Sequence, residues 1–160
     1  MITVISATNR PQSYTSKVAT TYVKLLEGKG IAAKYLTLEH LPLDFAFQHV
    51  SDPYSLKMSS LVDEFIVSSK KFVIVSPEYN GSFPGVLKTF IDIVQPKAFL
   101  GKKAALIGLS SGSAGNNRGM DHLTNILNYI NIDVLSYKVA IPHILDVVDE
   151  KMNSTMSGLY

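Results

Sequence analysis

The stretch FVIVSPEYNGSFPG, residues 72–85, decides the fold of this chain. Its first four residues are apolar and rich in β-branched side chains, a pattern typical of a strand buried on both faces. The strand runs into a loop with prolines at both ends, Pro77 and Pro84, and with the pair Asn80-Gly81 between them. Proline fixes φ and glycine lets the backbone approach another group closely, so this loop is more rigid than a plain connection needs to be.

The same order of strand, loop and helix recurs along the 160 residues. Short apolar runs predict five strands, at residues 2–6, 32–38, 72–76, 104–109 and 134–140. Apolar residues at helical spacing predict helices at residues 14–29, 56–69, 85–94, 118–130 and 144–151. We expect a single domain over residues 1–160 with a three-layer α/β architecture, in which helices cover both faces of a five-stranded parallel sheet. Right-handed crossovers favour the flavodoxin-like strand order 2-1-3-4-5.

The composition excludes several classes of protein and of site. Hydrophobic residues make up 46% and charged residues 18%, and no apolar stretch is long enough to cross a bilayer. The start lacks the basic and apolar regions of a signal peptide, so we expect a cytoplasmic protein. The absence of cysteine excludes thiolate metal sites, and the four histidines show no metal-ligand spacing, so no metal is predicted. A net charge of +2 is too small to predict binding to nucleic acid.

The first predicted strand runs into a loop rich in hydroxyl groups. Thr8, Ser13, Thr15 and Ser16 could donate hydrogen bonds, and the guanidinium of Arg10 could bind two phosphate oxygens. The helix that follows directs its unpaired N–H groups and a partial positive charge at the same place. The loop is therefore a candidate phosphate site, although an ordinary Ser/Thr-rich helix N-terminus would explain the hydroxyls equally well. It is neither a dinucleotide fingerprint nor a P-loop.

The two loops are expected to lie close together. In an open parallel sheet, ligands bind at the carboxyl ends of the strands, near the point where the strand order reverses. The first loop, residues 8–16, suits a phosphate. The rigid second loop suits a flat polar ring, toward which the N–H groups of Tyr79, Asn80 and Gly81 could point. Together the loops predict a mononucleotide cofactor, for which flavin is the best candidate.

A third loop, residues 110–119, follows the fourth predicted strand and is rich in serine, glycine and asparagine. It could close over the edge of the cofactor, with Arg118 at the start of the next helix, or it could be a flexible connection. Residues 108–112 also match the G-x-S-x-G pattern of a hydrolase, centred on Ser110, and Asp133 and His143 follow in the right order. That pattern requires a helix that starts at the serine, and here residues 112–117 intervene, so a hydrolase is a minor alternative.

Residues 77–92, PEYNGSFPGVLKTFID, closely resemble the signature P-E-Y-N-G-S-x-P-G-x-L-K-x-x-I-D of the NADPH-dependent FMN reductase family, which includes quinone, chromate and azo-dye reductases. The first loop resembles the family's phosphate loop, G-S-x-R-x-x-S-x-N, and residues 110–119 resemble its third loop. The chain departs from these patterns at several positions. Ala7 replaces a glycine, Thr8 a serine and Thr15 an asparagine in the first loop, while Ser113 replaces an arginine and Asn116 a glycine in the third.

The resemblance implies an FMN-dependent oxidoreductase that passes hydride from NADPH or NADH through bound FMN to a small acceptor. The acceptor would be a quinone, an azo compound, a metal oxyanion or free flavin. No catalytic side chain is implied, because the flavin carries the chemistry. The first loop would hold the phosphate, and the second would line the isoalloxazine, where its N–H groups would stabilise negative charge. The predicted cofactor-binding residues are Thr8, Arg10, Ser13, Thr15, Ser16, Pro77, Glu78, Tyr79, Asn80, Gly81, Ser82, Ser110 and Gly112.

The resemblance also implies a homodimer or homotetramer, with no nucleic-acid or membrane partner. The sequence gives weaker support, because the apolar stripe of the helix at residues 85–94 is wider than one core-facing side needs. Phe45, Phe47 and Tyr54 lie in a stretch with few charges, and they either form an interface or cover the protein's own core. Two functional alternatives stay open: a flavodoxin-type electron carrier without NAD(P)H activity, and a flavin-free relative that acts through protein contacts.

Overall fold

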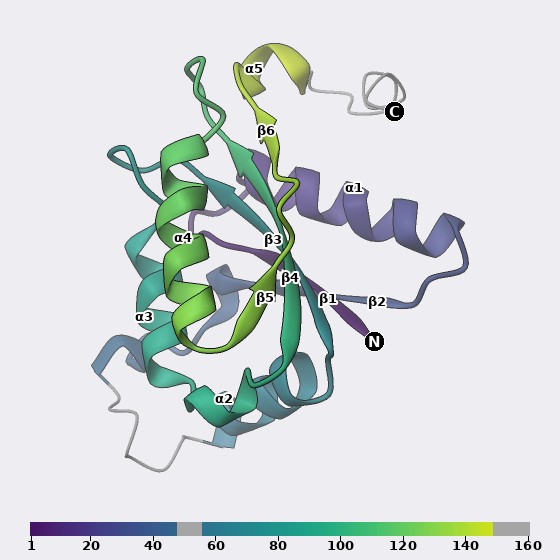
Figure 1. Ribbon diagram of the computed structural model, residues 1–160, viewed down its shortest axis with the longest axis vertical. Coiled ribbons are helices and arrows are strands. Elements are labelled where there is room, and N and C mark those ends of the chain that lie inside the picture. The colour runs from purple at the N-terminus through teal and green to yellow at the C-terminus, as the bar shows by residue number, and fades with distance from the viewer. Residues whose placement is uncertain (48–55, 149–160) are drawn as a thin grey trace.

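The computed structural model describes residues 1–47 and 56–148. A parallel sheet lies at its centre, with the strand order β2-β1-β3-β4-β5 and with β6 also paired to β4 (Figure 1). The predicted strand order 2-1-3-4-5 is thereby confirmed. The strands are β1 (Ile2–Ser6), β2 (Ala33–Thr37), β3 (Lys71–Pro77), β4 (Lys102–Leu109), β5 (Ile132–Val134) and β6 (Val139–Ile141).

Helices cover both faces of the sheet, as the alternating pattern predicts (Figure 1). The α-helices are α1 (Tyr14–Gly28), α2 (Leu56–Leu61), α3 (Gly85–Ile93), α4 (Asn117–Tyr129) and α5 (Ile144–Val147). The 3-10 helices are η1 (Leu38–His40), η2 (Phe45–Phe47) and η4 (Pro96–Ala98), and η3 (Val62–Val67) is a π-helix that continues α2. None of the described helices combines the length and the apolar character that crossing a membrane requires.

The side chains of the central strands alternate between two hydrophobic cores. Ile5, Ile74 and Leu106 belong to the core that α2, α3 and α4 cover. Their chain neighbours, among them Val4 and Val73, belong to the core that α1 and α5 cover. Because both faces of the sheet are buried, the strands read as continuous apolar runs rather than as an alternation of apolar and polar residues.

The prediction of one continuous strand at residues 134–140 is wrong. The structure has two short strands, β5 and β6, which both pair with β4, and the chain leaves the sheet between them. In this break Leu135 is 54% exposed and Tyr137 is 81% exposed. Lys138 forms an ion pair with Asp121 of α4 at 3.1 Å. An apolar run alone does not distinguish a continuous edge strand from one that is interrupted.

The predicted helix at residues 56–69 is present, but its second half is a π-helix rather than an α-helix. The N–H of Ser68 donates to the carbonyl of Asp63, five residues back. Donors from the sheet take up carbonyls of this segment: the hydroxyl of Thr3 donates to Phe65 and the ammonium of Lys102 donates to Ile66. Burial lowers the pKa of Lys102. Tyr54 and the predicted end of the last helix, residues 149–151, lie outside the described residues.

Candidate functional site

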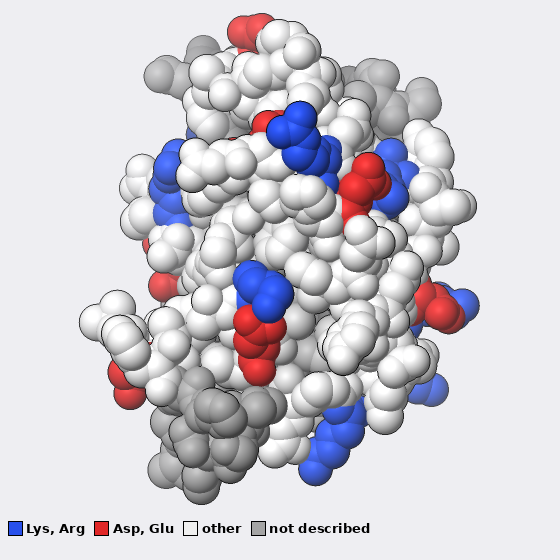
Figure 2. Space-filling model, turned by 60° about the vertical axis from the view of Figure 1, so that its left-hand side comes forward, with Lys and Arg blue, Asp and Glu red and all other residues white. Residues whose placement is uncertain are grey.

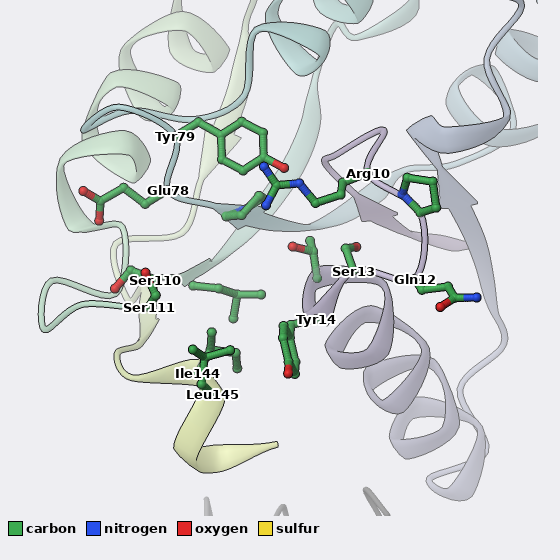
Figure 3. A pocket seen from close by; sticks show the side chains of 14 residues that line it. Arg10, Gln12, Ser13, Tyr14, Glu78, Tyr79, Ser110, Ser111, Ile144 and Leu145 are labelled. Atoms are coloured by element: carbon green, nitrogen blue, oxygen red, sulfur yellow. The ribbon is translucent and has the colours of Figure 1, made fainter. Parts of the chain in front are cut away.

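The carboxyl ends of β1, β3, β4 and β6 meet at one edge of the sheet, and the segments that follow them enclose a cavity of about 300 Å³ (Figure 3). Its walls are residues 10–15 after β1, residues 77–79 at the end of β3, residues 109–111 at the end of β4, and residues 144–145 in α5. A volume of this size is at the lower end of the range for small-molecule sites. All three loops that the sequence selected therefore contribute to one cavity.

A chain of hydroxyl groups fixes the wall made by the first loop. Ser13 is the N-cap of α1, and its Oγ accepts a hydrogen bond from the N–H of Ser16 at 3.1 Å. The hydroxyl of Ser16 lies 3.0 Å from that of Ser13 and 3.1 Å from that of Ser6 on β1. The capping role and the phosphate role are therefore compatible, because the same residues present the positive end of α1 to the cavity.

A second contact joins the first loop to the second. The guanidinium carbon of Arg10 lies 5.0 Å from the centre of the Tyr79 ring, and Figure 3 shows the two side chains against each other. The hydroxyl of Tyr79 lies 2.8 Å from that of Thr8. Thr8 is fully buried and also accepts a hydrogen bond from the N–H of Arg10 at 3.2 Å. The hydroxyl of Thr8 thus joins the two loops, whereas Ser13 lines the cavity.

The second loop closes in a tight turn. Tyr79 and Ser82 exchange two backbone hydrogen bonds, of 2.8 and 3.0 Å. Asn80 and Gly81 between them both have positive φ, of 52° and 74°, as a type I′ hairpin turn requires. The prediction that the N–H of Tyr79 points at a ligand is wrong, because that group donates to Ser82. The hydrogen bonds of the turn use neither the N–H of Asn80 nor that of Gly81.

The structure brings together most of the predicted cofactor-binding residues, but not all of them line the cavity. Seven do so: Arg10, Ser13, Thr15, Pro77, Glu78, Tyr79 and Ser110. Thr8 and Ser16 lie in the hydrogen-bond network described above, without lining the cavity. Asn80, Gly81, Ser82 and Gly112 belong to the adjoining turn and loop, outside its walls. The binding roles of all thirteen stay predictions.

Sequence reasoning missed other residues of the site. Gln12 and Tyr14 of the first loop line the cavity, as do Ile144 and Leu145 of α5. A usable signal exists for the α5 pair, since it directly follows the last strand and therefore lies at the same edge of the sheet. The sequence patterns show Asn116 only as a departure from a glycine, but its φ of 64° is one that asparagine tolerates better than most other residues do.

The hydrolase alternative is not supported by the geometry. Ser110 donates its hydroxyl hydrogen to the carbonyl of Gly112 and accepts the N–H of Gly115, at 2.7 and 2.8 Å. The next helix, α4, begins only at Asn117. Asp133 pairs in register with Lys103 near the start of β4, whereas Ser110 follows its carboxyl end. Within residues 1–47 and 56–148, no three His, Asp or Glu side chains form a group that could hold a metal ion.

The chemistry of the cavity fits FMN. Arg10 and the N-terminus of α1 supply positive charge for a phosphate, and Ser13 adds a hydroxyl. The rigid turn offers the backbone N–H groups of Asn80 and Gly81 next to residues 77–79 of the cavity wall. The aliphatic side chains of Leu109, Ile144 and Leu145 add an apolar wall, which a largely aromatic ligand requires.

Comparison with known proteins places this site in a family context. The model of the family "NADPH-dependent FMN reductase" matches residues 1–146. Over 138 residues the chain is 30% identical to an NAD(P)H-dependent FMN reductase of Pseudomonas aeruginosa, covering 82% of this chain and 71% of that protein. Over 130 residues it is 31% identical to a quinone reductase of Escherichia coli, covering 79% of this chain and 69% of that protein.

A solved structure agrees with these sequence matches. The flavoenzyme NAD(P)H:acceptor oxidoreductase FerB from Paracoccus denitrificans superposes with a TM-score of 0.77 and 25% sequence identity. The superposition covers 99% of this chain and 89% of FerB. The match therefore extends over both faces of the sheet and over all of the loops that form the cavity.

We expect Arg10→Ala to weaken FMN binding by roughly ten- to a hundredfold, because it removes a charge-assisted hydrogen bond to the phosphate. Quenching of flavin fluorescence in a titration of the protein with FMN measures this. Lys24→Ala, an exposed change of the same charge on the side of α1, is the matched control and should leave the affinity unchanged. Equal affinities of the two variants would contradict a phosphate site in the first loop.

Gly81→Val should reduce FMN affinity beyond its effect on stability. The φ of 74° strains any β-branched residue, and a Cβ would lie 3.0 Å from Nη1 of Arg118, at the turn that would meet the ring. Gly101→Val is the control, because Gly101 has a φ of 69° and no atom within 4 Å of a Cβ. Melting curves should show similar losses for both variants, while an FMN titration should show lost affinity only for Gly81→Val. Parallel behaviour in both measurements would show that the turn does not approach the cofactor.

Proposed function

The chain belongs to the NADPH-dependent FMN reductase family, and we propose that it is an NAD(P)H-dependent oxidoreductase that reduces quinones at the cavity between its first and second loops. The single observation that carries this proposal is the meeting of a cationic, hydroxyl-rich helix N-terminus and a rigid hairpin turn at one cavity. The similarity to a quinone reductase of Escherichia coli supports the choice of acceptor.

Each loop has a defined task in this proposal. Arg10, Ser13 and the N-terminus of α1 bind and orient the phosphate. Pro77, Glu78 and Tyr79 fix the position of the ring, and their rigidity limits the ordering entropy lost on binding. Ser110 and its loop close the third side.

Bound FMN supplies the hydride-transfer chemistry. The contribution of the protein is position and electrostatics: N–H groups of the turn stabilise negative charge on the ring, and the apolar wall of Leu109 and Ile144 keeps water from that side. The site needs no side chain as acid or base for hydride exchange between nicotinamide and flavin. We propose that residues 1–160 act as one domain in this reaction. A cytoplasmic location stays a prediction.

A spectroscopic experiment tests the proposed function. Protein mixed with FMN and freed of excess should show flavin absorption bands, which NADPH should bleach without oxygen and which a benzoquinone should then restore. Arg10→Ala protein, treated in the same way, should retain less flavin. Absence of flavin uptake by the unmodified protein would favour a flavin-free relative. Uptake without bleaching by either NADPH or NADH would favour an electron carrier.

We also propose that the active form is a homodimer. The wide apolar stripe of α3 does not support this, because Leu87, Phe90 and Ile91 are buried in the protein's own core and Phe45 packs against that core. The better support is the face of α3 and α4, where Figure 2 shows white surface between separate blue and red groups, with one adjoining blue and red pair near the centre. A groove of about 430 Å³ lies there, with Ile91, Ile126 and Tyr129 in its walls.

Exposed aromatic side chains occur at this face. Tyr129, at the end of α4, is 88% exposed. Phe47 of η2, which packs against α3, is 91% exposed. Large exposed aromatic groups beside a groove with apolar walls are typical of protein interfaces, and here the charges of Lys88 and Asp92 in the groove are paired with each other. A two-fold symmetric arrangement is the commonest way to bury such a surface.

Tyr129→Asp should weaken self-association about tenfold or more, since it puts a charge in place of an aromatic anchor. Light scattering coupled to size exclusion, over a range of micromolar concentrations, measures the mass against the 17.5 kDa of one chain. The control is Tyr137→Asp, since Tyr137 is 81% exposed in the break between β5 and β6. A mass of 17.5 kDa for the unmodified protein would contradict the dimer. Dissociation by Tyr137→Asp alone would place the interface elsewhere.

A further inference from the structure

Asn116 makes an unusual set of contacts for a residue at the start of a helix. It is the N-cap residue of α4, yet its side chain makes no capping hydrogen bond. Asparagine at an N-cap normally accepts a hydrogen bond from an N–H of the first turn. Here Nδ2 instead donates to the carbonyls of Ser76 and Pro77, at 3.1 and 3.0 Å. The side chain thus faces the end of β3, forty residues earlier in the sequence.

The other end of the second loop lies against the first turn of the same helix. Gly119, three residues after Asn116, leaves no room for a side chain. A Cβ there would lie 2.7 Å from the carbonyl carbon of Ser82 and 2.8 Å from the nitrogen of Phe83. It would also overlap Oδ1 of Asn116. Helix α4 therefore contacts the second loop where it begins, at Ser76 and Pro77, and where it ends, at Ser82 and Phe83.

The burial of Asn116 indicates that this contact is specific. The residue is 0% exposed, and among the described residues no donor reaches its Oδ1. An unpaired buried acceptor is unfavourable. Hydrogen bonding of every polar atom in the side chain therefore does not explain why Asn116 is buried here. Its two donated bonds to consecutive carbonyls hold the chain where it leaves β3, while the backbone of Asn116 itself has a φ of 64°.

We propose that Asn116 is a positioning residue for the flavin loop: its amide sets the orientation of residues 77–82 and thereby the affinity and the reduction potential of bound FMN. This inference rests on the proposed function for its flavin part. The effect on the loop itself is independent of any cofactor. Asn116 acts through the backbone of Ser76 and Pro77, and not by contact with the substrate.

The test uses Asn116→Gly, which keeps the positive φ accessible but removes both donors. Asn116→Asp is the second variant, because an ionised carboxylate of similar size cannot donate to two carbonyls. Asn131→Gly is the matched control: Asn131 has a φ of 63° but follows the opposite end of α4. Hydrogen exchange of the Tyr79 and Ser82 amides in protein without FMN measures the loop. FMN titration and potentiometry of the loaded protein measure the consequence.

We expect both Asn116 variants to exchange the Tyr79 and Ser82 amide hydrogens about tenfold faster and to bind FMN about tenfold or more weakly, as the loss of two hydrogen bonds implies. If reduced FMN loses tenfold more affinity than oxidised FMN, the potential falls by about 30 mV. Asn131→Gly should change none of these values. Unchanged exchange in the Asn116 variants, or equal effects of Asn131→Gly, would overturn the inference. Failure of the unmodified protein to bind FMN would overturn its flavin part together with the proposed function, whereas the exchange rates would still decide the positioning of the loop.

Discussion

The pairing of β3 with a parallel neighbour on each side is the constraint on which the rest of the structure depends. It aligns Val75 with Ser6 of β1, and Pro77 with Leu109 of β4. The pairing continues into the loops, because the N–H of Ala7 donates to the carbonyl of Val75 and the N–H of Glu78 to that of Leu109, at 2.9 and 2.8 Å. Parallel strands end at the same edge, so three loops distant in sequence must meet there.

The loops at this edge are held largely by their own hydrogen bonds. Ser13 caps α1, Tyr79 bonds to Thr8 and to Ser82, and Ser110 bonds to Gly115. This internal bonding orders the site before a ligand arrives, and a preorganised site loses less entropy on binding. The same bonds limit which groups a ligand can use. The N–H of Tyr79 already donates a hydrogen bond within the turn, whereas Arg10, whose guanidinium lies over the Tyr79 ring, lines the cavity.

The departures from the family patterns have local physical explanations. Ala7 is fully buried and belongs to the core beside α3 and α4, so its methyl group adds packing where the family has glycine. Thr8 retains the hydroxyl of the family's serine, and this hydroxyl forms a hydrogen bond with that of Tyr79. Asn116 occupies a glycine position because asparagine, like glycine, adopts positive φ, and its amide gains two contacts that glycine could not make.

The sequence by itself determined the layers, the strand order and the three loops of the site, because these depend on local patterns. The patterns are buried apolar runs, apolar residues at helical spacing, and the prolines and the Asn-Gly pair within residues 72–85. It also determined the family, through a long signature that can be matched without coordinates. Only the tertiary structure decided how the side chains meet. The contact of Thr8 with Tyr79, the wall of Ile144 and Leu145, and the reach of Asn116 to Ser76 all join residues that are far apart in the chain. The ion pair of Lys138, in the break between β5 and β6, with Asp121 of α4 is another contact of this kind. Such contacts depend on the position of each element in space, and local sequence patterns carry no record of it.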